Sequence, residues 1–314
     1  MHSLGIDIGG TKTAMVLVDS EGRVVAEKIF PTARQNPEHQ IELLKRHFEE
    51  LTANRSLPKT IGIGIAGQIE KSTGTVLLAP NVQWKQVPIK QLIEKAFHLP
   101  TTVLNDVRAA AWGEWLYGAG KGCNDLLCLF FGTGVGGAFI DDGILREGAS
   151  NTAGEIGHMV IDLNGRACSC GQRGCWETLV GGWGIAKMVQ EGVRAEPERA
   201  SLFLQLAQGN SETLSARHLF EAHKQGDPLA KQMIDRVSHA MVAGVASLIN
   251  TFNPARLVVG GGVIEGYPEF LPLLRRDVPK ACLEAAAHSF EIVESKLKGN
   301  AVAVGAAACA KELK

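Results

Sequence analysis

The segment that decides the fold is Leu4-Gly5-Ile6-Asp7-Ile8-Gly9-Gly10-Thr11-Lys12, which leads directly into Thr13-Ala14-Met15-Val16-Leu17-Val18. Its apolar residues predict two short buried strands, at residues 4–8 and 14–18, and the glycines between them predict a tight turn. Ser20-Glu21-Gly22 then predicts a second turn, which leads into a third strand at residues 23–30. We therefore expect this segment to form a hairpin followed by a third strand.

The same order of elements recurs at residues 126–143. An apolar strand at 126–131 precedes the turn Gly132-Thr133-Gly134-Val135-Gly136-Gly137, and a strand at 138–140 precedes Asp141-Asp142-Gly143. The Gly-Thr pair occupies the same position in both copies. The repetition predicts two similar half-molecules that face each other, with one glycine turn from each half in the cleft between them.

Strands and helices alternate through the rest of the first half, which is typical of an α/β fold. Apolar residues at intervals of three and four predict helices at 37–54, 89–98 and 107–117, and apolar runs predict strands at 60–66 and 101–104. Beyond residue 177 the pattern is mainly helical, with helices expected at 182–193, 215–224, 228–251 and 301–314 and a strand at 257–259.

The composition excludes several classes of protein. The chain has 314 residues, 45% of them hydrophobic and 21% charged, and a net charge of −1. These values are typical of a soluble globular protein with no general attraction to nucleic acid or anionic membranes. No apolar run approaches the roughly 20 residues that span a bilayer, and no secretory signal is evident. Cysteines outside residues 168–175 are scattered, so we expect a reducing, cytoplasmic location.

A cluster of soft ligands lies between residues 155 and 177. His158, Cys168, Cys170 and Cys175 fall within this glycine-rich segment, and the carboxylates of Glu155 and Glu177 flank them. Three thiolates and one imidazole suit tetrahedral zinc and leave no position for a catalytic water. We therefore predict a structural zinc site. The alternative is that the cysteines are ordinary buried thiols.

Three glycine turns follow apolar strands and could approach phosphate oxygens with their backbone amides. They contain the candidate ATP-binding residues Asp7, Gly9, Gly10, Thr11, Lys12, Gly132, Thr133, Gly134, Gly136, Gly261 and Gly262. The carboxylate of Asp7 is a candidate ligand for Mg²⁺, directly or through water. Each turn alone could be a plain hairpin, but two matching turns and a third together favour nucleotide binding. None has the pattern of a Walker loop or of a dinucleotide site.

Asn105-Asp106 ends a predicted strand, and α/β proteins bind ligands beyond the carboxyl ends of their strands. Asp106 is therefore a candidate base that accepts the proton of an attacking hydroxyl. The alternative is that Asp106 is a helix cap.

Together these motifs resemble the ROK family of repressors and sugar kinases over nearly the whole chain. The resemblance rests on residues 7–12, 62–67, 80–84, 105–106 and 132–137, and most specifically on Glu155-x-Gly157-His158 and the Cys-x-Cys-Gly-x-x-Gly-Cys-x-Glu loop at 168–177. It implies an α/β, two-lobed actin-like ATPase fold of the ribonuclease H type, with a cleft between the lobes. We expect one lobe at 1–115, joined by the helix at 301–314, and a larger lobe with the zinc loop at 116–300.

The resemblance also implies the activity, namely transfer of the γ-phosphate of ATP with Mg²⁺ to the 6-hydroxyl of a hexose, with glucose the leading substrate. Asp106 becomes the expected catalytic base. The implied substrate contacts are Gly67, Asn81, Asn105, Asp106, Glu155, His158 and Glu177. The implied zinc ligands are His158, Cys168, Cys170 and Cys175, and a homodimer is expected. The alternatives are a kinase for N-acetylmannosamine or N-acetylglucosamine and, more remotely, a sugar-responsive transcriptional regulator. Such regulators carry a helix-turn-helix domain ahead of the first phosphate motif, and we expect none here.

Overall fold

The computed structural model describes residues 2–311, which form two compact units. The first unit comprises residues 1–124, 138–154 and 295–314, and the second comprises residues 125–137 and 155–294. The chain therefore passes between the units at four places. This division assigns residues 138–154 to the first unit, whereas the sequence placed all of 116–300 in one lobe; the lobe boundaries stay a prediction.

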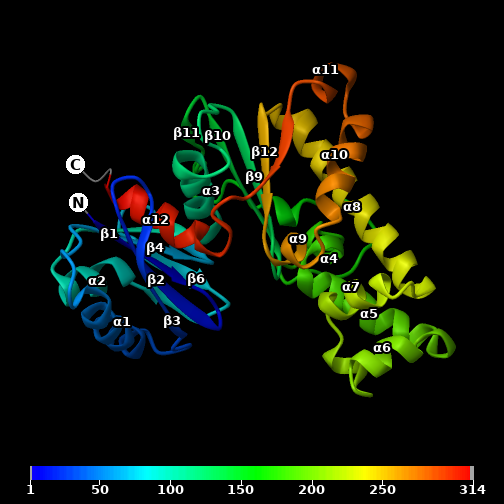
Figure 1. Ribbon diagram of the computed structural model, residues 1–314, viewed down its shortest axis with the longest axis horizontal. Coiled ribbons are helices and arrows are strands. Elements are labelled where there is room, and N and C mark those ends of the chain that lie inside the picture. The colour runs from blue at the N-terminus through cyan, green and yellow to red at the C-terminus, as the bar shows by residue number, and fades with distance from the viewer. Residues whose placement is uncertain (1, 312–314) are drawn as a thin grey trace. The chain divides into compact units, whose positions relative to one another are not determined.

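A mixed five-stranded sheet forms the centre of the first unit (Figure 1). Its order is β3-β2-β1-β4-β8, where the strands are β1 (Ser3–Ile8), β2 (Lys12–Val18), β3 (Val24–Pro31), β4 (Ile61–Ile65) and β8 (Thr101–Asn105). β1 and β2 form the predicted antiparallel hairpin, whereas β1, β4 and β8 run parallel to one another. The apolar residues of β1 and β4 are almost fully buried, which explains why both strands read as continuous apolar runs.

The helices of this unit are α1 (Pro37–Thr52), α2 (Ile89–Phe97), α3 (Asp106–Tyr117) and the C-terminal α12 (Ala301–Lys311). α12 packs closely against β1, β4 and α3, as Figure 1 shows. Its alanine-rich sequence permits this approach, because a Cβ added at Gly5 or Gly62 would overlap the carbonyl oxygen of Ala303 or Ala306. A three-stranded sheet of β5 (Gln68–Glu70), β6 (Thr75–Ala79) and β7 (Trp84–Val87) completes the unit, and its strands were not predicted from the sequence.

The second sheet repeats the plan of the first. Its order is β11-β10-β9-β12-β13, where the strands are β9 (Leu126–Phe131), β10 (Val135–Asp141), β11 (Ile144–Leu145), β12 (Arg256–Gly260) and β13 (Glu291–Glu294). β9 pairs in parallel with β12, as β1 does with β4, and β12 pairs in parallel with β13, as β4 does with β8. The duplication predicted from the two Gly-Thr turns is therefore confirmed at the level of strand order.

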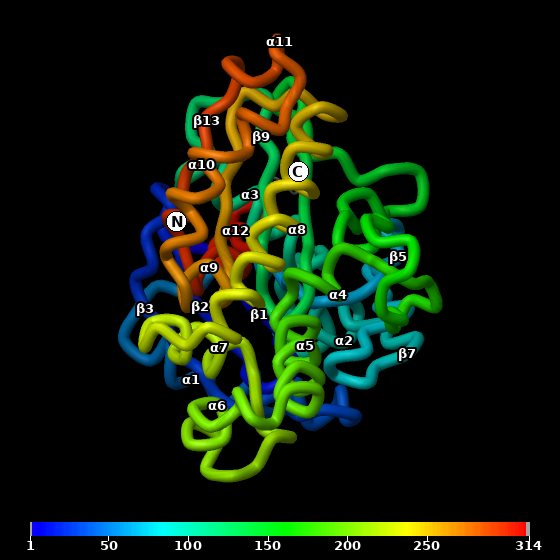
Figure 2. Tube along the Cα trace, turned by 90° about the vertical axis from the view of Figure 1, so that its right-hand side faces the viewer, coloured from blue at the N-terminus to red at the C-terminus, as the bar shows by residue number. Residues whose placement is uncertain are grey.

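The remainder of the second unit is mainly helical. Its elements are η1 (Ile156–His158), α4 (Glu177–Val180), α5 (Gly182–Ala195), η2 (Pro197–Arg199), α6 (Ser201–Leu206), η3 (Ser211–Thr213), α7 (Ala216–Lys224), α8 (Pro228–Phe252), α9 (Gly262–Gly266), α10 (Phe270–Ala281) and α11 (Glu284–Ala287); η4 (Lys298–Asn300) precedes α12 in the first unit. The long helix α8 packs against α7 and α10 (Figure 2). No helix within residues 2–311 is both long and apolar enough to cross a bilayer.

Candidate functional site

The carboxyl ends of three parallel strands meet at one edge of the first sheet. Ile8 at the end of β1 lies opposite Ile65 of β4, and Ile65 lies opposite Asn105 of β8. The turn that begins at Gly9, the turn at Gly67 and the start of α3 therefore follow adjacent strand ends. This is the edge of an α/β sheet at which ligands bind.

Asn105 and Asp106 have different structural roles at this edge. Asn105 is the N-cap of α3, and its Oδ1 accepts hydrogen bonds from the backbone N–H groups of Val107 (3.0 Å) and Arg108 (3.3 Å). Its Nδ2 donates a long bond of 3.5 Å to the carbonyl oxygen of Gly67. Asp106 is the first residue of the helix, so the alternative that it is the cap is wrong. The side chain of Asn105, and not that of Asp106, therefore caps the helix.

Asp7 and Asp106 are electrostatically coupled. Burial of Asp7, reinforced by the negative charge of Asp106, raises the pKa of Asp7 to about 7, although Lys12 acts in the opposite direction. A bound cation would favour the ionised form of Asp7, because its charge would offset both the burial of the carboxylate and the repulsion from Asp106. This is the electrostatic situation expected of the predicted Mg²⁺ ligand.

We expect Asp7→Asn to stabilise the protein when divalent cations are absent. The pKa of Asp7 is higher in the folded protein than the ordinary value of 3.8, so ionisation costs stability progressively as the pH rises from about 4 to 7. The neutral amide avoids this cost, which is on the order of 2–4 kcal/mol above pH 7. The free energy of unfolding should therefore increase in the variant at pH 8 and change little at pH 4. An equal effect at both pH values would contradict the assignment.

The turn after β1 is held by its own backbone and by the loop after β6. The N–H of Gly9 donates to the carbonyl oxygen of Lys12 (3.0 Å), and a Cβ added at Gly10 would lie 3.2 Å from the Cβ of Asn81. Thr11, Lys12 and Asn81 all have exposed side chains. The structure therefore brings the first predicted phosphate turn against the predicted sugar contact Asn81.

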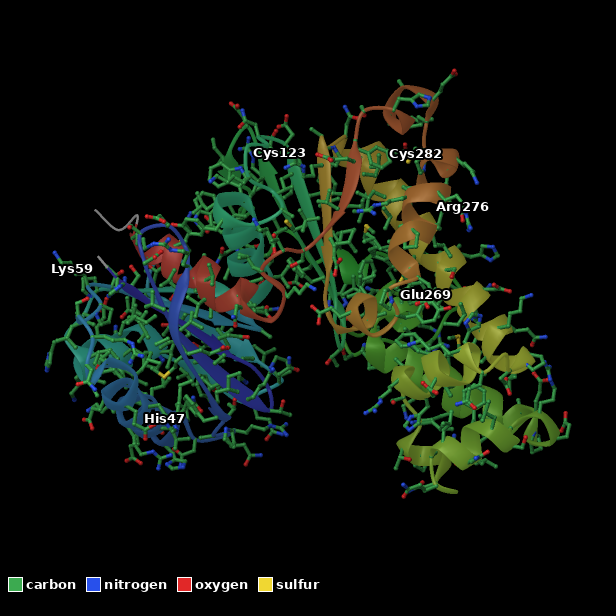
Figure 3. All side chains as sticks on the ribbon, in the orientation of Figure 1. His47, Lys59, Cys123, Glu269, Arg276 and Cys282 are labelled. Atoms are coloured by element: carbon green, nitrogen blue, oxygen red, sulfur yellow. The ribbon has the colours of Figure 1, made fainter. Side chains whose placement is uncertain are left out.

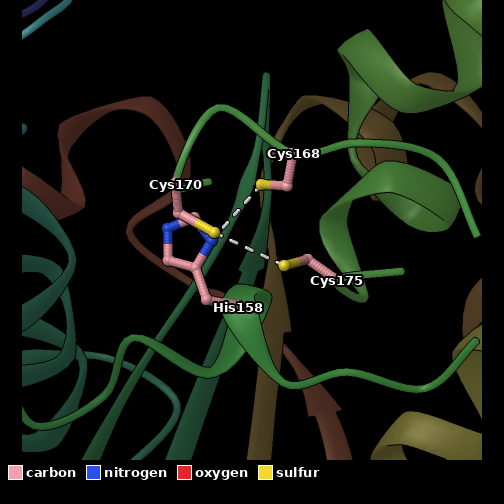
Figure 4. A group of neighbouring side chains, drawn as sticks. All are labelled: His158, Cys168, Cys170 and Cys175. Atoms are coloured by element: carbon pink, nitrogen blue, oxygen red, sulfur yellow. Dashed lines mark hydrogen bonds between the residues drawn. The ribbon is translucent and has the colours of Figure 1, made fainter. Parts of the chain in front are cut away.

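The predicted metal ligands come together in the second unit. His158, Cys168, Cys170 and Cys175 point toward one another (Figure 4), and one ligand atom from each lies within 4.8 Å of all the others. The Sγ atoms of Cys170 and Cys175 are 3.6 Å apart, and the Sγ of Cys168 is 3.6 Å from the Nδ1 of His158. For tetrahedral zinc with its usual bond lengths, ligand atoms are separated by about 3.8 Å (S to S) and about 3.6 Å (S to N). The four residues therefore fit a tetrahedral zinc ion.

Two isolated bridges and a glycine contact fold this loop. Val160 pairs with Cys175 and Ala167 with Arg173, while a Cβ added at Gly174 (φ +70°) would overlap the carbonyl oxygen of Asp162. The loop is also fixed to α8, because the Nε1 of Trp176 donates to the carbonyl oxygen of Ala240 (2.8 Å). The loop is therefore held in place by the backbone and by packing as well as by its thiols.

The two predicted sugar-binding carboxylates lie beside this cluster. Oε1 of the buried Glu177 is 3.2 Å from the Sγ of Cys168 and 3.9 Å from the Nδ1 of His158, whereas Oε2 of the exposed Glu155 is 4.0 Å from the Nε2 of His158. His158 therefore presents Nδ1 to the thiols and Nε2 to Glu155. The imidazole therefore lies between the thiols and the carboxylate of Glu155.

A cavity of about 550 Å³ connects two predicted phosphate turns. Gly132, Thr133 and Gly262 line this cavity. The other lining residues, which the sequence did not indicate, come from the start of α5, from α7 with its N-cap, and from α9: Gly182, Trp183, Ser215, Ala216, Arg217, Phe220, Glu221, Lys224, Val263 and Gly266. Its size is that of a small-molecule site. The helix at 216–224 was predicted from its periodicity, but periodicity does not indicate which helix faces a cavity.

The turn at residues 132–137 is also packed against the start of α4 and α5. The N–H groups of Gly182 and Trp183 donate to the carbonyl oxygens of Gly132 and Thr133, each at 2.9 Å. A Cβ added at Gly134 would lie 2.5 Å from Oε2 of Glu177. A side chain at position 134 would therefore displace the carboxylate of Glu177, which lies between the predicted phosphate turn and the thiol loop.

The structure thus distributes the predicted residues over both units. Gly67, Asn81, Asn105, Asp106 and residues 7–12 belong to the first unit, and Glu155, His158, Glu177, residues 132–136 and residues 261–262 belong to the second. Gly261 has φ of +93° and a Cβ there would lie 2.6 Å from the carbonyl oxygen of Phe131, which explains the glycine.

The comparisons with known proteins agree on one family. The ROK family model matches residues 3–313. The glucokinase of Streptomyces coelicolor is 33% identical over 311 residues, which are 99% of this chain and 98% of that protein. The xylose repressor of Caldicellulosiruptor bescii is 31% identical over 96% of this chain and 76% of that protein. A crystal structure of a ROK family glucokinase from Streptomyces griseus, in complex with glucose and AMPPNP, has a TM-score of 0.83, 33% identity and coverage of 99% of this chain and 100% of that chain. The chain therefore belongs to the ROK family and has the α/β, actin-like ATPase fold of its sugar kinases.

Proposed function

We propose that this protein is an ATP-dependent hexokinase that transfers the γ-phosphate to the 6-hydroxyl of glucose. The observation that carries the proposal is the placement of Asp106 directly after the carboxyl end of β8, as the first residue of a helix that Asn105 caps. The glucokinase relatives, which match over almost their whole length, support the same reaction. Asp106 is then the base that accepts the proton of the sugar hydroxyl.

The proposed sugar contacts follow from the donors and acceptors that a sugar needs. Asn105 uses its Oδ1 as a helix cap, so its Nδ2 is the group left to donate to a hydroxyl. The carboxylates of Glu155 and Glu177 accept from hydroxyls, and the Nε2 of His158 exchanges a hydrogen bond with one of them. The backbone at Gly67 and the exposed side chain of Asn81 complete the proposed set of contacts.

The nucleotide is assigned to the glycine turns and to the cavity in the second unit. The cavity, which Trp183, Phe220 and Arg217 line, has the size and the aromatic lining suited to the adenosine of ATP. The residues assigned to the phosphates are those of the glycine turns: Gly9, Gly10, Thr11, Lys12, Gly132, Thr133, Gly134, Gly136, Gly261 and Gly262. When bound, Mg²⁺ would neutralise charge on the phosphates, and Asp7 would hold it directly or through water.

The proposed mechanism depends mainly on positioning. Phosphoryl transfer passes through a loose transition state, so the hydroxyl becomes acidic only as its bond to phosphorus forms. Asp106 holds the hydroxyl in line with the phosphate and accepts its proton late in the step. Exclusion of water from the reacting groups limits wasteful hydrolysis of ATP.

We assign a structural zinc ion to His158, Cys168, Cys170 and Cys175. Two separations of 3.6 Å that are close to those of a tetrahedral site, and the grouping of all four ligand atoms within 4.8 Å of one another, support this assignment. Zinc would lock the orientation of His158 and of the two neighbouring carboxylates, and it would take no part in the chemistry. A homodimer is also proposed, on the resemblance to the family alone.

The main alternative is a kinase for N-acetylmannosamine or N-acetylglucosamine, which the same motifs would serve. A remote alternative is a sugar-responsive regulator, because xylose repressors are among the relatives. The net charge of −1 gives this chain no general attraction to DNA.

The decisive experiment measures ADP release with ATP, Mg²⁺ and a panel of sugars. Glucose should stimulate release most strongly, and its 6-deoxy analogue should be inactive because it lacks the attacking hydroxyl. Preference for an N-acetylhexosamine by tenfold or more in kcat/KM would replace glucose with the alternative substrate. If no sugar stimulated ADP release, the kinase assignment itself would be wrong.

A further inference from the structure

Helix α3, which begins at Asp106, contains two buried charged residues that the proposed chemistry does not use. Glu114 is fully buried, and Arg108 is 4% exposed. Burial of a charged side chain is costly unless hydrogen bonds satisfy it, so their partners indicate what they do. Each side chain holds a segment of the first unit close to a point where the chain passes to or from the second unit.

The carboxylate of Glu114 holds the segment that returns from β13. Its Oε1 accepts from the hydroxyl of Ser295 (2.6 Å) and the N–H of Leu297 (2.7 Å). Its Oε2 accepts from the N–H groups of Ala119 (2.7 Å) and Lys296 (3.2 Å). Each carboxylate oxygen therefore receives two donors. The chain enters the first unit at residue 295, so Glu114 bonds the returning segment from its first residue onward.

The guanidinium of Arg108 holds the segment before another crossing. It donates to both the Oδ1 and the carbonyl oxygen of Asn151, the latter at 2.7 Å. Asn151 has φ of +59°, a conformation that asparagine tolerates, and its Nδ2 donates to the carbonyl oxygen of Ile69 (2.8 Å). The next residues lead to Gly154 (φ +95°), after which the chain enters the second unit.

We propose that Arg108 and Glu114 anchor two of the four chain crossings to the helix that carries the proposed base, so that bending at these two crossings is confined to residues 154–155 and 294–295. Motion between compact units is the usual expectation, and a hinge consists of a few residues that absorb the change in backbone angles. The glycine at 154 is suited to this role. Both anchors act through other residues, so they are positioning residues rather than catalytic ones.

The inference rests on the proposed kinase activity, because its functional consequence concerns sugar phosphorylation. A loosened anchor lets the bend spread into residues 148–151 or 295–298. The reacting groups are then held less well, and water competes better with the sugar for the phosphate. The expected signature is therefore more ATP hydrolysis for each sugar phosphate formed, together with a lower kcat and a nearly unchanged KM for the sugar.

The test uses Glu114→Gln and Arg108→Lys in the full-length protein. Glutamine has the shape of glutamate, but either orientation of its amide places an NH₂ group against two donors. Lysine keeps the positive charge of Arg108, but it lacks the planar guanidinium that donates to both the Oδ1 and the carbonyl oxygen of Asn151. At saturating glucose, we expect the ratio of hydrolysis to sugar phosphorylation to rise about tenfold in each variant. Leu44→Ala is the control, because Leu44 is a fully buried residue of α1 away from the anchors and should lower stability without changing the ratio.

Hydrogen exchange of the wild-type protein gives a second test that does not depend on activity or on the folding of a variant. The amides of Lys296 and Leu297, which bond Glu114, should exchange as slowly as those of α3, with or without glucose. Fast exchange of these amides, or an unchanged ratio in both variants, would overturn the proposal. Absence of sugar phosphorylation in the wild type would instead contradict the proposed function and leave the exchange result to decide the anchor.

Discussion

Asp106→Asn should lower kcat for glucose phosphorylation by about a hundredfold or more, while the KM for glucose changes little. The amide keeps the shape of the carboxylate, but it cannot accept the proton that the hydroxyl loses as phosphorus bonds to oxygen. The N-cap of α3 should survive because Asn105, not Asp106, provides it. Steady-state kinetics with a coupled ADP assay, together with calorimetric glucose binding, measures both quantities.

The stability of Asp106→Asn at pH 8 distinguishes loss of the base from misfolding of the variant. The charge of Asp106 contributes to the raised pKa of Asp7, so its removal should bring that pKa down and leave the variant at least as stable as the wild type at pH 8. Asp142→Asn is the matched control, since Asp142 is an exposed aspartate in the β10–β11 turn whose positive φ also suits asparagine. Near-normal turnover of Asp106→Asn would refute the assignment of Asp106 as the base. An equal loss of kcat in Asp142→Asn would refute it as well.

The strand plan could be predicted because local patterns determine it. The apolar runs at 4–8 and 126–131 and the Gly-Thr turns after them indicated the duplicated hairpin, and both sheets carry it. Helices α1, α5 and α8 lie close to their predicted residues because each presents an apolar face with helical spacing. The C-terminal end of the helix predicted at 301–314 lies outside the described residues, which end at 311.

The sheet β5-β6-β7 was not predicted because its strands are short and only partly apolar. Gln68–Glu70 alternates exposed and buried residues over three positions, which is too short for a periodicity to stand out. Their pairing also depends on contacts between segments, and no pattern within one segment reports it. Helix α10 was missed for a related reason, since Pro279 lies inside it and proline usually ends a helix.

In the candidate site, too, residues identified by a local pattern could be predicted, whereas residues whose role depends on distant partners could not. The zinc ligands could be predicted because residue type and spacing within one loop identify them. The cavity lining from Trp183 to Lys224 and the anchors Arg108 and Glu114 could not. Their roles arise from partners far away in the sequence, such as Ser295 for Glu114, which is 181 residues distant. The sequence suggested Asp106 as a possible helix cap, whereas the cap in the structure is Asn105. Residue propensities do not locate a helix boundary to within one residue.

Removal of one thiol ligand should release the proposed zinc and destabilise the second unit. Cys170 is the exposed member of the cluster, so Cys170→Ser deletes a ligand with little change in packing. Serine is a poor zinc ligand, and three remaining ligands hold the ion far more weakly. Loss of a tightly bound ion costs several kcal/mol, so the melting temperature should fall by roughly 5–10 °C. Elemental analysis should find about one zinc per chain in the wild type and almost none in the variant.

Chelation makes this prediction specific to the metal. A strong chelator should lower the melting temperature of the wild type to that of Cys170→Ser and should have no further effect on the variant. Cys282→Ser provides the control, because Cys282 is the C-cap of α10 (Figure 3) and is not one of the four clustered residues, so its loss should leave the zinc content unchanged. Glucose affinity should fall with the zinc, since His158 and the two carboxylates lose their fixed orientation. Full zinc content and an unchanged melting curve in Cys170→Ser would show that the four residues do not form a metal site.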